Sequence, residues 1–194
     1  MTQRDFMIGY GSILSRQSRQ RSGLTGPALK VDLLGWRRAW SVRYRDEAST
    51  YLGLVEDEAA RLHAVLVPVD INPHMRHRER GYSWTEVDGS KLRVEGEMPD
   101  GRFWIVVNHA HEPADADHPI PQTYVDTCLI GALETGGEAM LRDFITMTDH
   151  WDTHWVDDRF EPVYPRRAPL DRDSQAMIDD HLHDAGVLRY RTRR

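Results

Sequence analysis

The sequence predicts an α+β fold in which a small mixed or antiparallel β-barrel is flanked by helices. Two features of the chain support this prediction. Short apolar segments of strand length, separated by turn residues, dominate the first half, and longer segments with helical spacing follow. Strands followed by helices favour an antiparallel or mixed sheet that carries the helices on its outside.

Size and composition are those of one globular domain, spanning residues 1–194. The barrel and its helices are expected over about 6–150, and 151–194 is a C-terminal extension that matches no known pattern. The net charge of −6 argues against nucleic-acid binding, and no apolar run is long enough to span a membrane. With no secretion signal and a single cysteine, Cys128, we expect a cytoplasmic protein with a buried structural thiol. No pattern indicates the oligomeric state.

The early strands and the helix after them follow from local signals. Strands are expected over Phe6–Gly9, Lys30–Arg43, Leu52–Glu56 and His63–Pro68. Within the second of these, Gly35 suits a β-bulge that bends the strand. A helix then begins where Asn72 can act as its cap and Pro73 suits its first turn. This helix is expected to end near Arg80, before Gly81.

The rest of the chain changes from strands to helices. Further strands are expected over Tyr82–Val87, Leu92–Gly96 and Arg102–Val107. The polar segment 112–121 is expected to be an ordered loop or a lid. Apolar residues from Val125 to Leu133 fall on one helical stripe, which Gly136 and Gly137 end. Helices are also expected over Glu138–Thr146 and Ser174–Ala185, joined by an extended connector that contains three prolines.

Two groups of arginines stand out in this acidic chain. Arg16, Arg19 and Arg21 are expected on a solvated helix face. The group at the end of the chain is expected to be a frayed tail and consists of Arg189, Arg191, Arg193 and Arg194.

The first strand ends at a sharp corner with the sequence Tyr10-Gly11-Ser12-Ile13. Glycine lets the backbone turn and lets a ligand approach it closely, and N–H groups at a strand-to-helix corner form an anion site. Most such corners only turn the chain, so this one alone is a weak signal. Ser12 either caps the next helix or contacts a ligand, and Tyr10 points either to a site or to the core.

A second segment, Arg78-Glu79-Arg80-Gly81-Tyr82, places a carboxylate where a helix leads into a strand. Glu79 either faces a cleft or is a solvated charge among arginines. Burial would favour its protonated form, whereas pairing with Arg76 or Arg78 would favour the carboxylate, and the sequence does not rank these effects.

Together these motifs resemble the γ-glutamylcyclotransferase-like family, which includes the ChaC-like branch. The family's Tyr-Gly-Ser signature is similar to Ile8-Gly9-Tyr10-Gly11-Ser12-Ile13-Leu14, and its Leu-x-Gly-x-x-Arg segment is similar to Leu34-Gly35-Trp36-Arg37-Arg38. Its Arg-Glu-x-Gly-Tyr stretch is similar to Arg78-Glu79-Arg80-Gly81-Tyr82. Its Ser/Thr-x-Tyr helix entry is similar to Pro121-Gln122-Thr123-Tyr124-Val125. Each motif is short, and their order and spacing over about 6–150 carry the resemblance.

The resemblance implies a barrel of five or six strands and an intramolecular aminolysis. The α-amino group of a γ-glutamyl substrate attacks its own γ-carbonyl, which gives 5-oxoproline and releases an amine or peptide. No metal, cofactor or covalent intermediate is implied. Because the nucleophile belongs to the substrate, no activated serine or cysteine is needed, and proximity lowers much of the barrier.

The resemblance also implies roles for particular residues. Glu79 would be the general base that takes a proton from the substrate's ammonium group. The N–H groups of Gly11, Ser12 and Ile13 would hold the substrate's α-carboxylate. The remaining candidate substrate-binding residues are Tyr10, Tyr82 and Tyr124. The hydroxyl of Tyr82 would orient Glu79 or the substrate; alternatively, Tyr82 is an aromatic residue of the core.

Two alternatives stay open at this point. Gly9 before Tyr10 and the unmatched extension depart from the family's pattern, so the barrel could bind a small carboxylate-bearing ligand without turnover. The ten histidines suggest a metal hydrolase, although no His-Glu-x-x-His motif is present. The candidate ligand pairs are His150 with His154, His109 with His111, and His181 with His183.

The motifs do not identify the leaving group of the implied reaction. Glutathione, a γ-glutamyl amino acid and a γ-glutamyl amine differ only in the part of the substrate remote from the motifs. We expect that part to contact segments such as 112–122.

Overall fold

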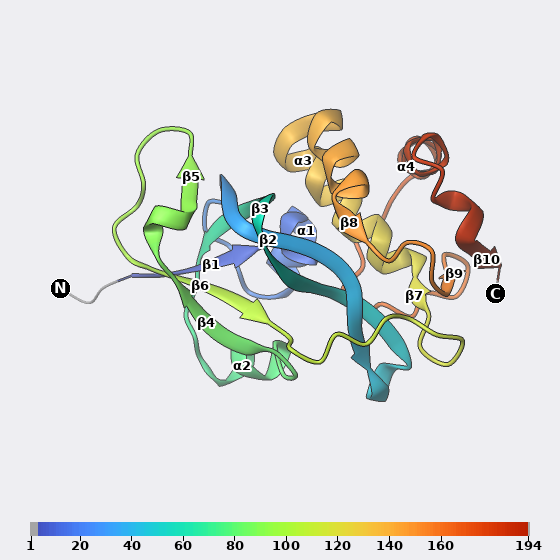
Figure 1. Cartoon of the computed structure of the whole chain (residues 1–194), viewed down its shortest axis with the longest axis horizontal. Helices are drawn as coiled ribbons and strands as arrows, with labels where there is room; N and C mark the ends of the chain where they lie inside the picture. The colour runs from blue at the N-terminus through green and yellow to red at the C-terminus, as the bar shows by residue number, and fades with distance from the viewer. Residues whose placement is uncertain (1–3, 194) are drawn as a thin grey trace.

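A mixed seven-stranded sheet, curled into a half-barrel, forms the body of the protein in a computed structural model that describes residues 4–193 (Figure 1). Its strands are β1 (Asp5–Gly9), β2 (Leu29–Tyr44), β3 (Ser49–Pro68), β4 (Ser83–Val87), β5 (Leu92–Val94), β6 (Arg102–Val107) and β8 (Thr148–Asp149). The order is β4-β6-β1-β3-β2-β5, with β8 beside β2. The β1–β6 and β2–β8 pairs are parallel and the other pairs are antiparallel, which confirms the predicted α+β class.

Strands β2 and β3 form the long bent hairpin at the centre of the sheet. The register shifts between Leu34 and Trp36, so the bulge expected at Gly35 is present. Strand β3 is continuous, whereas two strands were expected. The paired residues pass from Glu56 to Arg61 across a stretch that is largely exposed and lacks large apolar side chains, so it carried no strand signal.

Helix α2 (Pro73–Arg78) forms at the predicted place and delivers Glu79 to the end of the helix. The side chain of Asn72 accepts a hydrogen bond from Met75 N at 3.0 Å, as a helix cap does. Glu79 is the residue at the helix C-cap, and Gly81 follows with φ of +88°. This left-handed residue turns the chain into β4 two residues after Glu79.

Helix α3 (Gln122–Thr146) covers the first corner of the chain and contains the predicted interruption at Gly136 and Gly137. Its close contact with the corner depends on Gly131, where a Cβ would lie only 2.5 Å from the carbonyl carbon of Leu14. The corner is the turn η1 (Ser12–Leu14), followed by the short helix α1 (Arg16–Arg21). The other short turns are η2 (Arg45–Glu47), η3 (Gly89–Lys91) and η4 (Leu188–Tyr190).

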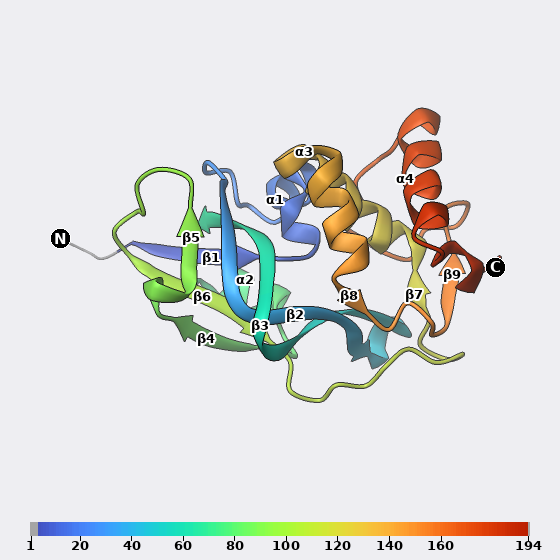
Figure 2. The same cartoon turned by 45° about the horizontal axis from the view of Figure 1, so that its top comes forward.

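The C-terminal extension folds onto α3 at the end of the molecule remote from β4 and β5 (Figure 2). It contains α4 (Arg172–Asp184) and most of a second, parallel sheet of β7 (Ile120–Pro121), β9 (Trp155–Asp157) and β10 (Arg191–Arg193). These strands have two or three residues each, which is too short for a periodic pattern, so the sequence did not predict them.

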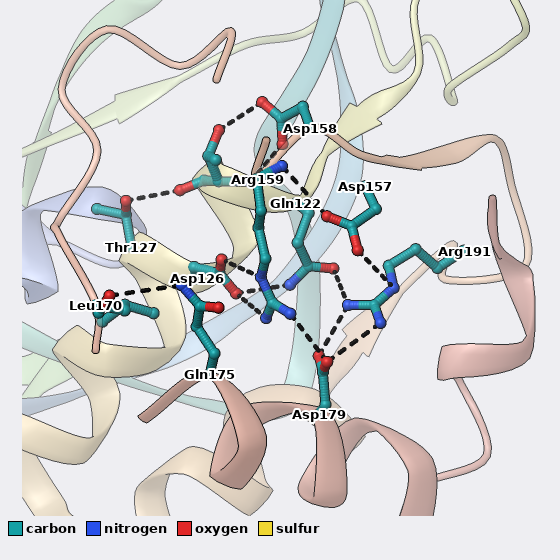
Figure 3. Close-up of polar contacts among 11 residues, drawn as sticks. Gln122, Asp126, Thr127, Asp157, Asp158, Arg159, Leu170, Gln175, Asp179 and Arg191 are labelled. Carbon is teal, nitrogen blue, oxygen red and sulfur yellow. Dashed lines mark hydrogen bonds and ion pairs between the residues drawn. The ribbon is translucent and has the colours of Figure 1, made fainter. Parts of the chain in front are cut away.

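A polar network anchors the extension (Figure 3). Arg159 bridges Asp126 of α3 and Asp179 of α4, with nitrogen–oxygen distances of 2.7 to 2.9 Å. Arg191 donates to Asp179 at 2.8 Å and to Gln122 at 3.0 Å. The expectation of a frayed tail is therefore wrong for Arg191, because the carboxylate of Asp179 on α4 and the amide oxygen of Gln122 on α3 both accept hydrogen bonds from it. Arg194 lies outside the described residues.

The expectation of a solvated helix face is wrong for Arg19 of α1. Its side chain turns inward, and the residue is buried. In the described part of the chain, 4–193, no helix combines the length and apolar character needed to cross a bilayer.

Candidate active site

Two buried arginines stabilise the corner between β1 and α1 through hydrogen bonds to its backbone carbonyls. Arg38 Nε donates to the carbonyl of Tyr10 at 2.7 Å, and its Nη2 donates to the carbonyl of His63. Arg19 Nη1 donates to the carbonyls of Ile13 and Leu14 at 2.8 and 2.6 Å. Burial lowers the pKa of Arg38, yet the carbonyls of Tyr10 and His63 both depend on its side chain for a hydrogen bond.

Because the arginines bind carbonyls of the corner, the backbone groups that the corner leaves available to a ligand are N–H groups. Those of Gly11, Ser12 and Ile13 donate to no other residue within 4–193, because the first bonds of the turn are from Leu14 N to Gly11 O and from Ser15 N to Ser12 O. The hydroxyl of Tyr124 approaches the corner so closely that a Cβ at residue 11 would lie 3.0 Å from it. Only glycine fits there without a shift, which explains Gly11.

All seven predicted site residues line one cavity of about 50 Å³, here named the corner hollow. They are Tyr10, Gly11, Ser12, Ile13, Glu79, Tyr82 and Tyr124. The structure therefore brings the end of α2 and the corner after β1 to the same space, about seventy residues apart in sequence.

Glu79 is buried, with 6% of the residue exposed, so it is not a solvated charge. It forms an ion pair with Arg78, whose Nε also donates to Ser22 Oγ at 2.9 Å. Oε1 of Glu79 is buried and makes no hydrogen bond of normal geometry with residues 4–193. Of the two arginines weighed as partners, Arg78 is the one that pairs, whereas Arg76 is exposed.

The tyrosine hydroxyls differ in what they do. That of Tyr10 donates to the carbonyl of Val106 and that of Tyr82 to the carbonyl of Leu52, both at 2.9 Å. These two residues line the hollow with their rings and brace the barrel with their hydroxyls. Tyr124 instead places its hydroxyl beside Gly11. Burial raises the pKa of all three, so each remains a neutral donor at physiological pH.

Ser12 does not cap α1, since that role belongs to Ser15, whose side chain accepts from Ser18 N. Ser12 instead lines the corner hollow and a second cavity beside it. The cap alternative is therefore wrong, and contact of Ser12 with a ligand stays a prediction.

The second cavity, named the tyrosine hollow, also has a volume of about 50 Å³ and shares a wall with the corner hollow. The shared residues are Ser12, Arg78, Glu79, Tyr82 and Tyr124. The tyrosine hollow is completed by Tyr44, Glu47, Tyr51, Arg80, Tyr164 and Arg166. Glu79 thus stands between two adjoining spaces.

Several residues at the site were missed by sequence reasoning. Tyr164 and Arg166 come from the extension, which carried no motif, and Tyr51 comes from β3. Arg38 belongs to a motif that the sequence analysis singled out, but its hydrogen bond to the carbonyl of Tyr10 was not predicted. The segment 112–121 is tied to β2 and β3, with Arg43 Nε donating to Pro113 O at 2.7 Å, and lines neither hollow.

The histidines do not gather into a metal site. Within residues 4–193, no group of three or more His, Cys, Asp or Glu side chains is arranged to hold a metal ion. Both His150 and His154 are exposed. Cys128 is buried, as predicted, and burial raises its pKa, so it is a packing residue and not a thiolate.

Comparison with solved structures identifies the half-barrel with its helices as the γ-glutamylcyclotransferase-like fold, which confirms the predicted fold. A gamma-glutamyl cyclotransferase is similar with a TM-score of 0.57 at 12% identity, over 90% of this chain and 98% of its own. The uncharacterized protein loc79017 from Homo sapiens gives a TM-score of 0.56 at 12% identity, over 92% of this chain and 99% of its own.

A third similar structure is YkqA from Bacillus subtilis, with a TM-score of 0.56 and 19% identity over 75% of this chain. This chain spans about half of YkqA, 55% of its length. No family model and no curated protein sequence matches the chain. These similarities establish the fold.

Proposed function

We propose that this protein is a γ-glutamyl cyclotransferase that converts a γ-glutamyl compound to 5-oxoproline with release of an amine. The observation that carries the proposal is that the buried carboxylate of Glu79 and the unpaired N–H groups of Gly11, Ser12 and Ile13 line one hollow. A base and an anion-binding corner are two of the elements that this reaction requires of a protein, and a donor to the developing oxyanion is the third.

In the proposed reaction the substrate supplies its own nucleophile. The α-nitrogen forms a bond to the γ-carbonyl carbon, and the bond from that carbon to the leaving nitrogen breaks. Glu79 accepts a proton from the attacking nitrogen and returns one to the leaving nitrogen, so no water and no other co-reactant is consumed. Holding the two reacting atoms of one molecule together is worth an effective concentration of about 10⁵ M or more.

Each group of site residues has its own role in the proposed reaction. The corner N–H groups hold the α-carboxylate, and Arg78 supplies the counter-charge to Glu79 when it is ionised. Tyr124 is the candidate donor to the developing oxyanion, because its hydroxyl lies at the corner, whereas those of Tyr10 and Tyr82 are engaged with carbonyls.

The test is to incubate the protein with a panel of γ-glutamyl amino acids, peptides and amines and to measure 5-oxoproline. Glu79→Gln keeps the shape and removes the base, so turnover should fall about 10²- to 10⁴-fold. Glu86→Gln is the matched control, because Glu86 is an exposed residue of β4 outside both hollows. Full activity in Glu79→Gln would show that the mechanism is wrong.

The alternative of a binding module without turnover is tested in the same experiment. It would be supported by calorimetric binding of a γ-glutamyl compound together with no 5-oxoproline from any member of the panel.

A further inference from the structure

The charges that line the tyrosine hollow do not balance. Arg78 is paired with Glu79, and Arg80 Nη2 lies 3.5 Å from Glu47 Oε1. The third guanidinium, that of Arg166, forms no ion pair with any residue from 4 to 193. Its Nε is buried and has no hydrogen-bond partner among those residues. A buried donor on a cation without a partner is costly unless a ligand supplies one.

The two carboxylates of the hollow are already committed. Glu47 Oε1 faces Arg80, and Glu47 Oε2 accepts the hydroxyl of Tyr51 at 2.5 Å. Burial acts to lower the pKa of Arg166, but Tyr164 and Glu47 raise it further than that, so the guanidinium keeps its charge. It also lies 5.3 Å from the ring centre of Tyr164, which restricts its orientation.

The extension is what brings this arginine to the site. Tyr164 is buried and packs edge to face against Tyr124 at 4.8 Å and against Tyr51 at 5.7 Å between ring centres. The segment that leads to it is held by Arg159, whose guanidinium lies between Asp126 and Asp179 (Figure 3). Arg166 is therefore on an anchored segment, two residues beyond a buried aromatic ring.

We propose that the tyrosine hollow takes the leaving group and that Arg166 binds a carboxylate on it, so that the substrates are γ-glutamyl derivatives of small amino acids and not of simple amines. This inference rests on the proposed function. Glu79 lies on the wall shared by both hollows, so a glutamyl group in the corner hollow would direct its leaving nitrogen toward the tyrosine hollow. A volume of about 50 Å³ suits a few non-hydrogen atoms, such as the carboxylate of a leaving group and the carbon that bears it.

A matched pair of substrates tests this assignment. γ-Glutamyl-alanine and γ-glutamyl-alaninamide have nearly the same size and differ in the charge that Arg166 would bind. For the wild type, kcat/KM should be roughly 10- to 100-fold higher for the acid than for the amide, because that ratio corresponds to the free energy of one charge-assisted hydrogen bond. In Arg166→Gln this ratio should fall toward one through loss of activity on the acid, and Arg166→Lys should retain part of it.

Arg167→Gln is the control, because Arg167 is exposed and lines neither hollow. It should keep the wild-type ratio. Equal turnover of acid and amide by the wild type, or an unchanged ratio in Arg166→Gln, would overturn the proposal. Circular dichroism of each variant separates a loss of the preference from a loss of folding.

Calorimetry with the same two compounds separates failure of this inference from failure of the proposed function. If no 5-oxoproline forms but the acid binds more tightly than the amide, and Arg166→Gln removes that difference, the carboxylate site stands and the catalytic proposal falls. If 5-oxoproline forms without any preference for the acid, the reverse holds. If neither compound binds or reacts, both are overturned.

Discussion

Arg78 and Glu79, neighbours at the end of α2, form an ion pair that is almost completely removed from solvent, with 8% and 7% of their side chains exposed. The pair lies on the wall between the two hollows. Burying two charges costs more in desolvation than a well-packed apolar pair would, so stability alone does not explain it. Its place between two cavities is the observation from which we infer that the charges serve the proposed reaction.

The first prediction concerns this pair. Arg78→Met leaves the carboxylate of Glu79 buried without a counter-charge and should lower the free energy of unfolding by about 3–5 kcal/mol. The double variant Arg78→Met/Glu79→Gln removes both charges and should regain much of that loss. Denaturant unfolding of the wild type, both single variants and the double variant gives the coupling. Additive losses would show that the two side chains do not act as a pair.

The second prediction concerns the contact between Gly11 and Tyr124. A methyl group at residue 11 would lie 3.0 Å from the Tyr124 hydroxyl and 3.4 Å from Leu52 Cδ1, so the tyrosine must move away from the corner. Gly11→Ala should lower kcat/KM for γ-glutamyl substrates by about tenfold or more, since small displacements at a reacting centre are costly. Stability, followed by thermal unfolding, should change by less than about 1.5 kcal/mol. Activity equal to wild type would contradict the tight corner.

The third prediction tests how α3 is seated on the corner. In Gly131→Ala the new methyl group would overlap the backbone of Leu14 and Ser15, which cannot move without shifting the turn. We expect a loss of about 1–3 kcal/mol in the free energy of unfolding. Gly89→Ala serves as the control, because the methyl group there meets only Phe103 at an ordinary contact distance of 3.4 Å. Equal effects of the two substitutions would contradict the close approach.

The fourth prediction is a pH dependence of the clasp formed by Arg159, Asp179 and Arg191. Burial acts to raise the pKa of Asp179, but hydrogen bonds from Arg191 and Arg159 outweigh it and hold the pKa below its usual value. Because the folded value is the lower one, the stabilisation is present above the pKa of the unfolded chain, about 4, and is lost as the pH falls through the folded value.

The measurement is the difference in unfolding free energy between the wild type and Asp179→Asn as a function of pH. It should be about 1 kcal/mol near neutral pH, since the site is half-exposed, and should shrink below about pH 4. Asp180→Asn, at an exposed position beside it and outside the clasp, is the control substitution. A difference that stays constant down to low pH would contradict the role given to Asp179.

The elements of the half-barrel were largely predictable because their signals are local. The cap at Asn72, the bulge at Gly35 and the interruption at Gly136 and Gly137 each depend on the chemistry of one or two residues. The short strands β7, β9 and β10 were not predictable, because they exist through pairing with distant segments and have no pattern of their own.

Local signals were enough to predict a glycine corner after β1 and an acid at the end of α2. Three features of the site depend on tertiary contacts: the burial of Glu79 and its pairing with Arg78, the hydrogen bonds of Arg38 and Arg19 to the corner carbonyls, and the position of Arg166 from the extension. Burial and contacts across the fold arise between segments that are distant in the sequence, so no local pattern predicts them. The tertiary contacts of a residue, unlike its neighbours along the chain, are determined by how the elements pack together.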